Sequence, residues 1–194
     1  MSDRLEPFEV IIAGPELEDL RARLRATRWP EPAPTRDWAY GTDLTYLQDL
    51  CAYWADEFDW RAQEARINAF DQVTTEIDGQ RVHTIHARST DPEATPLLIS
   101  HGWPGSVVEF LDIIEPLRET CHVVAPSLPG YAWSGPTTEP GWDTRRVADC
   151  LAELMTRLGY DRFVAQGGDW GAMITTQLGL RHPERLAGIH LNLV

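Results

Sequence analysis

The sequence predicts an α/β protein in which a parallel sheet is covered by helices on both faces and follows a helical segment. From residue 71 onward, short apolar runs alternate with segments of helical length, which is typical of buried parallel strands joined by helices. Residues 1–70 instead show helical periodicity, are rich in tryptophan and proline, and contain no strand–helix–strand pattern. We therefore expect two parts, residues 1–70 and residues 71–194.

The first part contains three expected helices. Gly14-Pro15 opens the first helix, and Trp29-Pro30 ends it because the residue before a proline disfavours helical backbone. Thr42 or Asp43 caps the second helix, and the third covers residues 60–70. Three helices are too few to enclose a core, so we expect them to lie on another part of the protein.

The second part opens with a hairpin around Asp78-Gly79, a residue pair that favours a two-residue turn. The elements expected after it are strand 96–100, helix 107–117, strand 121–125, helix 144–158, strand 163–165, helix 172–180 and a last strand near Ile189. No helix follows that strand before Val194, which leaves an apolar edge and face of the sheet uncovered. We therefore expect a fragment of a longer architecture that can self-associate through this edge.

The composition limits the classes of function. Hydrophobic residues make up 43% of the chain and charged residues 24%, as in soluble globular proteins. The net charge of -13 argues against nucleic acid and anionic membranes as partners. All 17 basic residues are arginine, which excludes Schiff-base chemistry on lysine. Neither a signal peptide nor an apolar run of the ~20 residues needed to span a bilayer is found, so we expect a cytoplasmic protein.

The three cysteines, Cys51, Cys121 and Cys150, are widely spaced and form no CxxC pair. This pattern indicates a reducing compartment and neither a disulfide framework nor a zinc site. We expect the cysteines to act as small buried apolar residues. The sequence predicts no metal site and no cofactor.

The candidate nucleophile is Asp169, in the turn Gly167-Gly168-Asp169-Trp170-Gly171 between an expected strand and an expected helix. A strand, a tight turn and a helix with small residues around a central nucleophile form a nucleophile elbow. Glycines are needed because the strained central residue brings neighbouring backbone very close. A carboxylate attacks carbon without first losing a proton and forms an ester, which suits epoxides or alkyl halides. The alternative is an aspartate in an ordinary glycine-rich turn.

A second motif, His101-Gly102-Trp103-Pro104-Gly105-Ser106, directly follows the strand that ends at Ser100. In elbow enzymes the loop after this strand and the residue after the nucleophile each supply one backbone N–H to an oxyanion hole. Here the donors would be Trp103 and Trp170, and we expect both residues also to contact substrate. For His101 we expect a buried structural role, hydrogen-bonded to backbone, rather than that of a general base.

These motifs resemble those of epoxide hydrolases of the α/β-hydrolase superfamily, in the microsomal-like branch with an N-terminal meander. The resemblance covers essentially the whole chain and also rests on residues 60–70 and on Pro126-Ser127-Leu128-Pro129-Gly130-Tyr131. It implies the first half of an α/β-hydrolase sheet preceded by a helical meander, with the lid and the C-terminal part of the fold absent. It further implies that Asp169 opens a small-molecule epoxide to a vicinal diol without a cofactor, in detoxification.

The chain also departs from the family pattern. In the family, two lid tyrosines hold the epoxide oxygen and a late histidine paired with an acid activates water. Those positions lie beyond this sequence, and none of the six histidines occupies the expected late loop. We therefore expect no efficient turnover by the isolated chain, and we expect Tyr131 to pack in its Pro-Gly loop.

Two alternatives stay open. The first is a relative of the haloalkane dehalogenases, which share the aspartate elbow. Trp103 and residues 1–70 both argue against it, because those enzymes usually carry asparagine in this loop and lack the N-terminal meander. The second is a truncated, non-catalytic remnant.

Overall fold

The computed structural model describes residues 4–35 and 38–193. The expectations that concern the first three residues and Val194 therefore fall outside the described residues. The chain divides into two compact units, one of residues 10–66 and one that joins the N-terminal residues through Glu9 to the chain from Ile67 onward. Within the described residues, no helix has the length and apolar character needed to cross a membrane.

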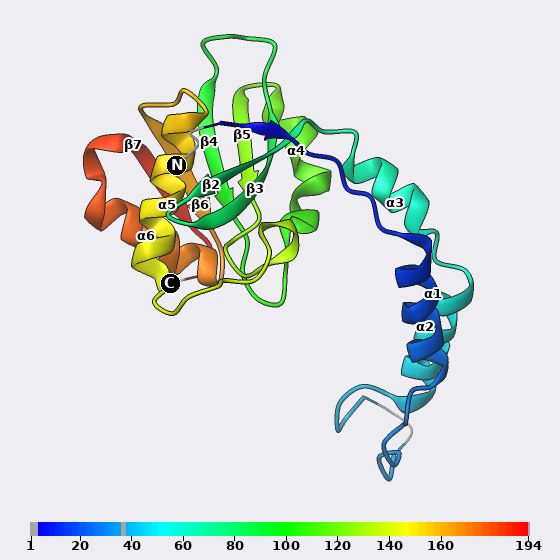
Figure 1. Cartoon of the computed structure of the whole chain (residues 1–194). Coiled ribbons are helices and arrows are strands. Elements are labelled where there is room, and N and C mark those ends of the chain that lie inside the picture. The colour runs from blue at the N-terminus through cyan, green and yellow to red at the C-terminus, as the bar shows by residue number, and fades with distance from the viewer. Residues whose placement is uncertain (1–3, 36–37, 194) are drawn as a thin grey trace. The chain divides into compact units, whose positions relative to one another are not determined.

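The smaller unit is helical, as predicted, with α1 (Gly14–Arg25), α2 (Leu44–Asp56) and the greater part of α3 (Trp60–Ile67) (Figure 1). Of the two expected caps for α2, Asp43 is the one used, because its carboxylate accepts a hydrogen bond of 2.9 Å from the Tyr46 N–H. α1 buries none of its side chains and α2 buries only Ala55. The two helices alone therefore enclose no substantial core.

The larger unit is built on a seven-stranded sheet in the order β1-β2-β3-β5-β4-β6-β7 among the described residues. The strands are β1 (Glu6–Pro7), β2 (Gln72–Ile77), β3 (Gln80–Ala87), β4 (Thr95–Ser100), β5 (Cys121–Pro126), β6 (Phe163–Gly167) and β7 (Leu186–Leu191). The run β5-β4-β6-β7 is parallel, whereas β1, β2 and β3 pair antiparallel. The sheet is therefore mixed, and the prediction of a parallel sheet holds only for its second half.

The predicted hairpin around Asp78-Gly79 is confirmed. β2 and β3 pair from Ile77 opposite Gln80, so the turn contains two residues. Asp78 and Gly79 have φ values of 52° and 71°, the positive values that such a turn requires. β1 has no counterpart in the prediction, because two residues are too few to show an alternating pattern.

Helices lie on both sides of the sheet, with α4 (Leu111–Arg118) on one face and α5 (Thr144–Arg157) and α6 (Trp170–Arg181) on the other (Figure 1). The segment expected to begin as one helix at Val107 starts instead with the 3-10 turn η1 (Val107–Phe110) before α4. The main apolar core joins the buried face of α5 to the sheet and to α6.

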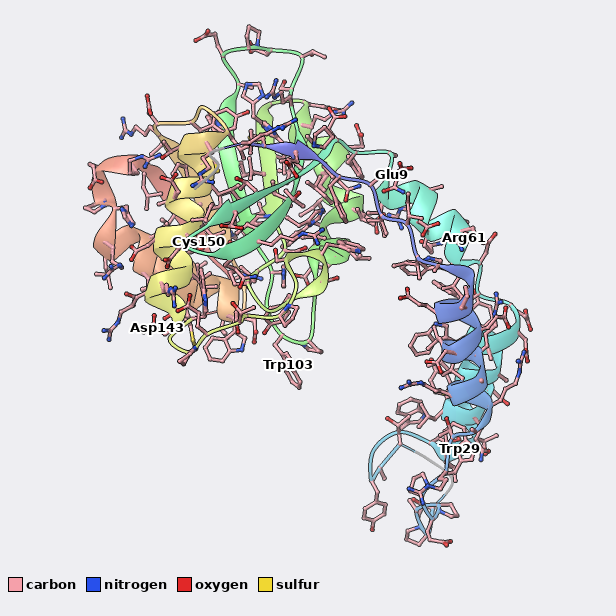
Figure 2. All side chains as sticks on the ribbon, in the orientation of Figure 1. Glu9, Trp29, Arg61, Trp103, Asp143 and Cys150 are labelled. Carbon is pink, nitrogen blue, oxygen red and sulfur yellow. The ribbon has the colours of Figure 1, made fainter. Side chains whose placement is uncertain are left out.

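Cys150 of α5 lies in this core (Figure 2), and burial raises the pKa of its thiol to about 12. Cys51 and Cys121 are half-buried, and all three cysteines are free. The expectation that the cysteines act as buried apolar residues therefore holds in full only for Cys150.

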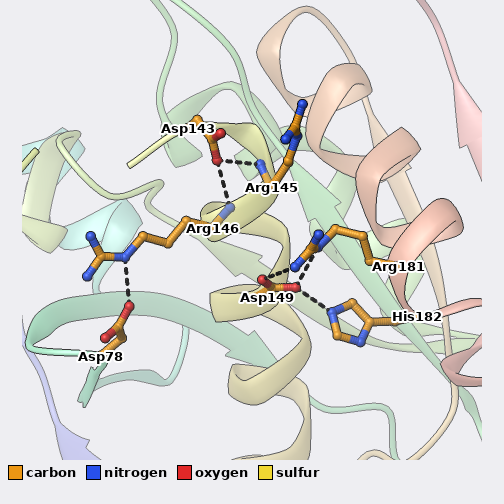
Figure 3. A network of polar contacts seen from close by, with 7 residues as sticks. All are labelled: Asp78, Asp143, Arg145, Arg146, Asp149, Arg181 and His182. Atoms are coloured by element: carbon orange, nitrogen blue, oxygen red, sulfur yellow. Dashed lines mark hydrogen bonds and ion pairs between the residues drawn. The ribbon is translucent and has the colours of Figure 1, made fainter. Parts of the chain in front are cut away.

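A surface cluster of polar side chains ties α5 to its neighbours (Figure 3). The carboxylate of Asp149 accepts two hydrogen bonds from Arg181, of 2.8 and 2.6 Å, and lies 2.7 Å from Nε2 of His182. On the other side of α5, Arg146 Nε donates a 2.7 Å hydrogen bond to Asp78 of the hairpin turn. The Asp149 contacts join α5 to the C-terminal end of α6, the helix whose other end carries the candidate nucleophile.

β7 is an edge strand of the sheet among the described residues, and its side chains are half-buried or exposed. Ile189 is 46% exposed, although it lies in the middle of the strand. The strand thus presents apolar surface beside a strand edge that pairs with no other strand among the described residues.

Candidate active site

Asp169 lies between the end of β6 and the start of α6, at the position that the elbow motif predicts. Its backbone has φ 51° and ψ -128°, a conformation that non-glycine residues rarely adopt. Strain of this kind persists where surrounding structure enforces it, and it is concentrated at functional sites. The Asp169 residue is exposed, so the carboxylate is open to solvent.

The glycines around Asp169 are explained by close approach of backbone. A methyl group at Gly167 would overlap the backbone of Gly171, and one at Gly171 would overlap the carbonyl of Ser100. At Gly168, a methyl group would lie 2.6 Å from the side-chain oxygen of Asn192. The three elbow glycines therefore let β6, α6 and the end of β4 meet around one residue.

A backbone N–H group holds the Asp169 carboxylate. The Trp103 N–H donates to Oδ1 of Asp169 at 2.8 Å. The Trp103 N–H, and after it the backbone N–H of Trp170, lower the pKa of Asp169 below its usual value. The structure thus brings together the three residues that the two motifs indicate, and it favours the ionised carboxylate.

The loop of Trp103 is fixed by His101. This buried ring lies with Nδ1 3.0 Å from the Gly102 carbonyl, and its Nε2 accepts a 3.1 Å hydrogen bond from the Leu128 N–H. Both nitrogens are therefore engaged, which defines a neutral tautomer with the proton on Nδ1. Burial lowers the pKa of His101. The expectation of a structural rather than a basic histidine is confirmed.

Asp169 opens into a cavity of about 960 Å³. One part of its lining is apolar and comes from β4, β6 and α4, including Leu97, Val164 and Ile113. The Trp103 residue, 68% exposed, borders this cavity, and its side chain points away from the sheet (Figure 2). Trp170, 47% exposed, borders a second, smaller cavity beside Tyr131. Tyr131 packs against the core and edge-on to the His101 ring, as expected.

Two polar residues of this cavity carry no signal in the sequence motifs. Glu109 lines it, and burial, followed by the negative charge of Asp169, raises the pKa of its carboxyl group. The buried hydroxyl of Ser100 lines it as well and has no hydrogen-bond partner among the described residues. Glu109 stands three residues after Ser106, a spacing that by itself indicates only a helix cap. Across residues 4–35 and 38–193, no group of three His, Cys, Asp or Glu residues is arranged to hold a metal ion.

Fold and site together define an α/β hydrolase, and residues 95–193 match the family model described as alpha/beta hydrolase fold. Residues 5–110 match the model described as Epoxide hydrolase N terminus, which covers more than half of the chain. The chain therefore belongs to the epoxide hydrolase family, as its motifs predicted.

Individual relatives agree with this assignment. The chain is 47% identical to a provisionally named epoxide hydrolase of Stigmatella aurantiaca, over 97% of this chain and 45% of that protein. It is 35% identical to epoxide hydrolase 1 of Oryctolagus cuniculus, over 98% of this chain and 45% of that protein. The chain thus spans about half the length of the curated relatives that it matches.

Solved structures of epoxide hydrolases also match nearly the whole of this chain and about half of their own length. The juvenile hormone epoxide hydrolase of Bombyx mori matches with a TM-score of 0.90 and 32% identity, over 98% of this chain and 53% of that one. The epoxide hydrolase of Aspergillus niger matches with a TM-score of 0.90 and 35% identity, over 98% of this chain and 52% of that one. These matches confirm the predicted first part of an α/β-hydrolase fold preceded by a helical segment.

Proposed function

We propose that this protein acts on epoxides through a covalent ester on Asp169. The observation that carries the proposal is the Asp169 carboxylate, which lies at a strained elbow and accepts a hydrogen bond from the Trp103 N–H. The names of the relatives, which include epoxide hydrolases of mammals, insects and fungi, support epoxides as the substrate class.

In the first step, Asp169 attacks an epoxide carbon. Since Oδ1 is held by Trp103, we assign Oδ2 as the attacking atom. The bond from Oδ2 to carbon forms, the carbon–oxygen bond of the ring breaks, and the alkoxide takes a proton from solvent. The strain of the three-membered ring drives this step, and the exposed carboxylate needs no prior proton loss.

In the second step, water attacks the ester carbonyl and charge develops on Oδ1. The Trp103 N–H already donates to Oδ1, so it is in place to stabilise this charge, and the neighbouring Trp170 N–H is the second donor that we propose. Loss of one such donor typically slows a reaction by about 100-fold or more. The diol then leaves and Asp169 returns to its carboxylate form.

The test is formation of the ester. Incubation of the chain with styrene oxide is expected to add one molecule, mapped to Asp169 by mass spectrometry of its peptides. Asp169→Asn should abolish the adduct. Asp143→Asn is the matched control, because Asp143 is another carboxylate that accepts backbone N–H bonds, at the start of α5. An adduct that survives in Asp169→Asn would contradict the proposal.

The same assay separates the alternatives. Reaction with 1-bromobutane and release of bromide, with no epoxide adduct, would favour the haloalkane dehalogenase alternative. No reaction with either reagent would favour a non-catalytic remnant. A role in detoxification and a cytoplasmic location stay predictions.

We further propose that the 194-residue chain turns over poorly by itself. Both ring nitrogens of His101 are occupied by backbone groups, and His83 is held in a buried network with Ser127 and Gln72. His190 lines the cavity, but no hydrogen bond joins it to Asp169 among the described residues. We expect each chain to release at most one molecule of diol in the time that ester formation takes. Multiple turnovers that disappear in Asp169→Asn would contradict this expectation.

A further inference from the structure

Asn192 follows the last residue of β7 and lies beside the elbow, at a position that neither sequence motif includes. Its backbone N–H donates a 3.3 Å hydrogen bond to the Gly167 carbonyl, and its Oδ1 accepts a 3.0 Å hydrogen bond from Nε2 of Gln166. These bonds join Asn192 to two successive residues at the end of β6. Asn192 therefore connects the end of β7 to the strand that leads into Asp169.

The Asn192 amide also packs against Gly168, the residue that directly precedes Asp169. A methyl group on Gly168 would lie 2.6 Å from Oδ1, 2.9 Å from Nδ2 and 3.1 Å from Cγ of Asn192. Three atoms at such similar distances indicate that the amide covers the position that a side chain would take. Asn192 thus contacts all three residues before the candidate nucleophile, two through hydrogen bonds and one through packing.

The elbow is held from both neighbours of β6 in the sheet. β4 lies on one side, and the loop after it supplies the Trp103 N–H to the Asp169 carboxylate. β7 lies on the other side, and Asn192 follows its last residue. Asp169 has a φ of 51°, and strained backbone of this kind persists where surrounding structure enforces it. Since Asp169 itself is exposed, much of that constraint acts through the residues next to it.

We propose that Asn192 is a positioning residue for Asp169. By holding residues 166–168, it keeps the Asp169 backbone in its strained conformation and the carboxylate within reach of the Trp103 N–H. In this role Asn192 exchanges no proton and forms no bond to substrate. Its importance for the reaction rests on the proposed function, because it matters there only if Asp169 attacks the epoxide.

The pKa of Asp169 makes the link between Asn192 and the carboxylate measurable. The hydrogen bond from the Trp103 N–H is the main reason that this pKa lies below its usual value. If the residues before Asp169 relax, the carboxylate moves off this donor and its pKa rises toward 3.8. A contact of Asn192 that served stability alone would leave this pKa unchanged. Substitution of Asn192 retains the other titratable groups near the carboxylate, which are Glu109, Tyr131 and His190.

Carbon-13 NMR of the aspartate carboxyl groups follows this pKa in the full chain, and the signal that is lost in Asp169→Asn identifies Asp169. In Asn192→Ala, protonation of Asp169 is expected to begin at a higher pH than in the unmodified chain, where circular dichroism shows both folded. Leu193→Ala is the matched control, because Leu193 is the next residue, is 48% exposed and makes none of these contacts among the described residues. The same Asp169 titration in Asn192→Ala and Leu193→Ala overturns the positioning role.

Gly168→Ala tests the packing without removing the amide. Its methyl group meets the Asn192 amide, so the variant should lose stability in urea. In Gly168→Ala combined with Asn192→Ala the amide is gone, so the added methyl group should cost less free energy of unfolding than in the unmodified chain. Equal costs in the two backgrounds would overturn the proposal, because the amide would then not lie against Gly168.

Formation of the styrene oxide adduct measures the consequence for the reaction. Asn192→Ala is expected to slow it about tenfold or more, because small misplacement of a reacting group is costly. Leu193→Ala should form adduct at the unmodified rate. Absence of adduct in the unmodified chain would overturn the proposed function, and the Asp169 titration would still decide whether Asn192 positions the carboxylate. An unchanged titration together with normal adduct formation in Asn192→Ala overturns the role of Asn192 alone.

Discussion

At the scale of single residues, the Asp169 carboxylate combines exposure with a hydrogen bond from the Trp103 backbone N–H. The backbone N–H groups of Trp103 and Trp170 lower its pKa and so favour the charged form, which is the form that the proposed attack on an epoxide requires. The same groups that orient Asp169 thus also set the pH range in which it can react. A surface aspartate without such donors would lack both the orientation and the lowered pKa.

The first prediction concerns this pH range. Since the folded-state pKa of Asp169 lies below its ordinary value of 3.8, the rate of adduct formation should stay constant through the weakly acidic range. The rate should fall only when the pH drops through the lowered pKa. Adduct formation with styrene oxide, measured under conditions where circular dichroism shows the fold intact, tests this. A midpoint above 3.8 would contradict the orientation of both N–H groups.

At the scale of elements, the elbow depends on contact between β6, α6 and the end of β4. Gly167→Ala should destabilise the protein by about 3 kcal/mol or more, because its methyl group meets the backbone of Gly171 rather than a movable side chain. Gly188→Ala in β7 is the matched control, since nothing lies within 4 Å of its added methyl group. Urea unfolding of both variants provides the measurement, and equal stability losses would argue against close packing at the elbow.

The Asp149 cluster joins α5 to the end of α6. Asp149→Asn should reduce the free energy of unfolding by about 1 kcal/mol, because these groups are partly exposed and water screens the ion pair. The loss should shrink at high salt. Glu184→Gln removes an equal charge from a residue with no ion pair among the described residues, so it should have little effect. Urea unfolding at low and high salt compares the Asp149→Asn and Glu184→Gln variants. Equal losses of unfolding free energy in the two variants would contradict a specific contact of Asp149.

At the scale of the whole molecule, buried neutral histidines predict sensitivity to acid. Burial lowers the pKa of His83 to about 3 and that of His86 to about 4, from an ordinary value of 6.5. At pH values below 6.5 but above these lowered pKa values, the unfolded chain therefore binds protons that the folded chain does not. The free energy of unfolding consequently falls as the pH drops below 6.5.

Urea unfolding at a series of pH values measures this loss. His83→Gln should lower stability at neutral pH, because it disturbs the contacts with Ser127 and Gln72, but it should reduce the dependence on pH. His190→Gln, at an exposed position, should leave the dependence unchanged. Equal stability at neutral and mildly acidic pH would contradict the buried neutral state of His83.

Self-association through the sheet edge stays a prediction at this scale. β7 carries the exposed Ile189 beside a strand edge that pairs with no other strand among the described residues, so we expect association that increases with protein concentration. Ile189→Lys should weaken it, whereas Leu180→Lys, at an exposed position on α6, should not. Sedimentation velocity over a range of concentrations tests this, and a monomer at all concentrations would contradict it.

Much of the fold could be predicted because its signals are local. Asp78-Gly79 specifies a two-residue turn, Thr42-Asp43 indicates a cap at one of these two residues, and the elbow is a run of five neighbouring residues. The mixed direction of the sheet could not be predicted from apolar runs. A buried strand has the same pattern whether its neighbour is parallel or antiparallel, and β3 pairs with β5 across a long stretch of chain.

The sequence by itself determined which residue is the candidate nucleophile and which residues surround it, because the elbow and the Trp103 loop depend on residue type and short spacing. Only the tertiary structure decided that the Trp103 N–H reaches Asp169, which lies 66 residues later, and that Glu109 shares their cavity. The pairing of β4 with β6 creates these contacts, since it places the ends of two distant strands side by side. Distances across a sheet follow from strand order and register, which residue spacing along the chain does not encode.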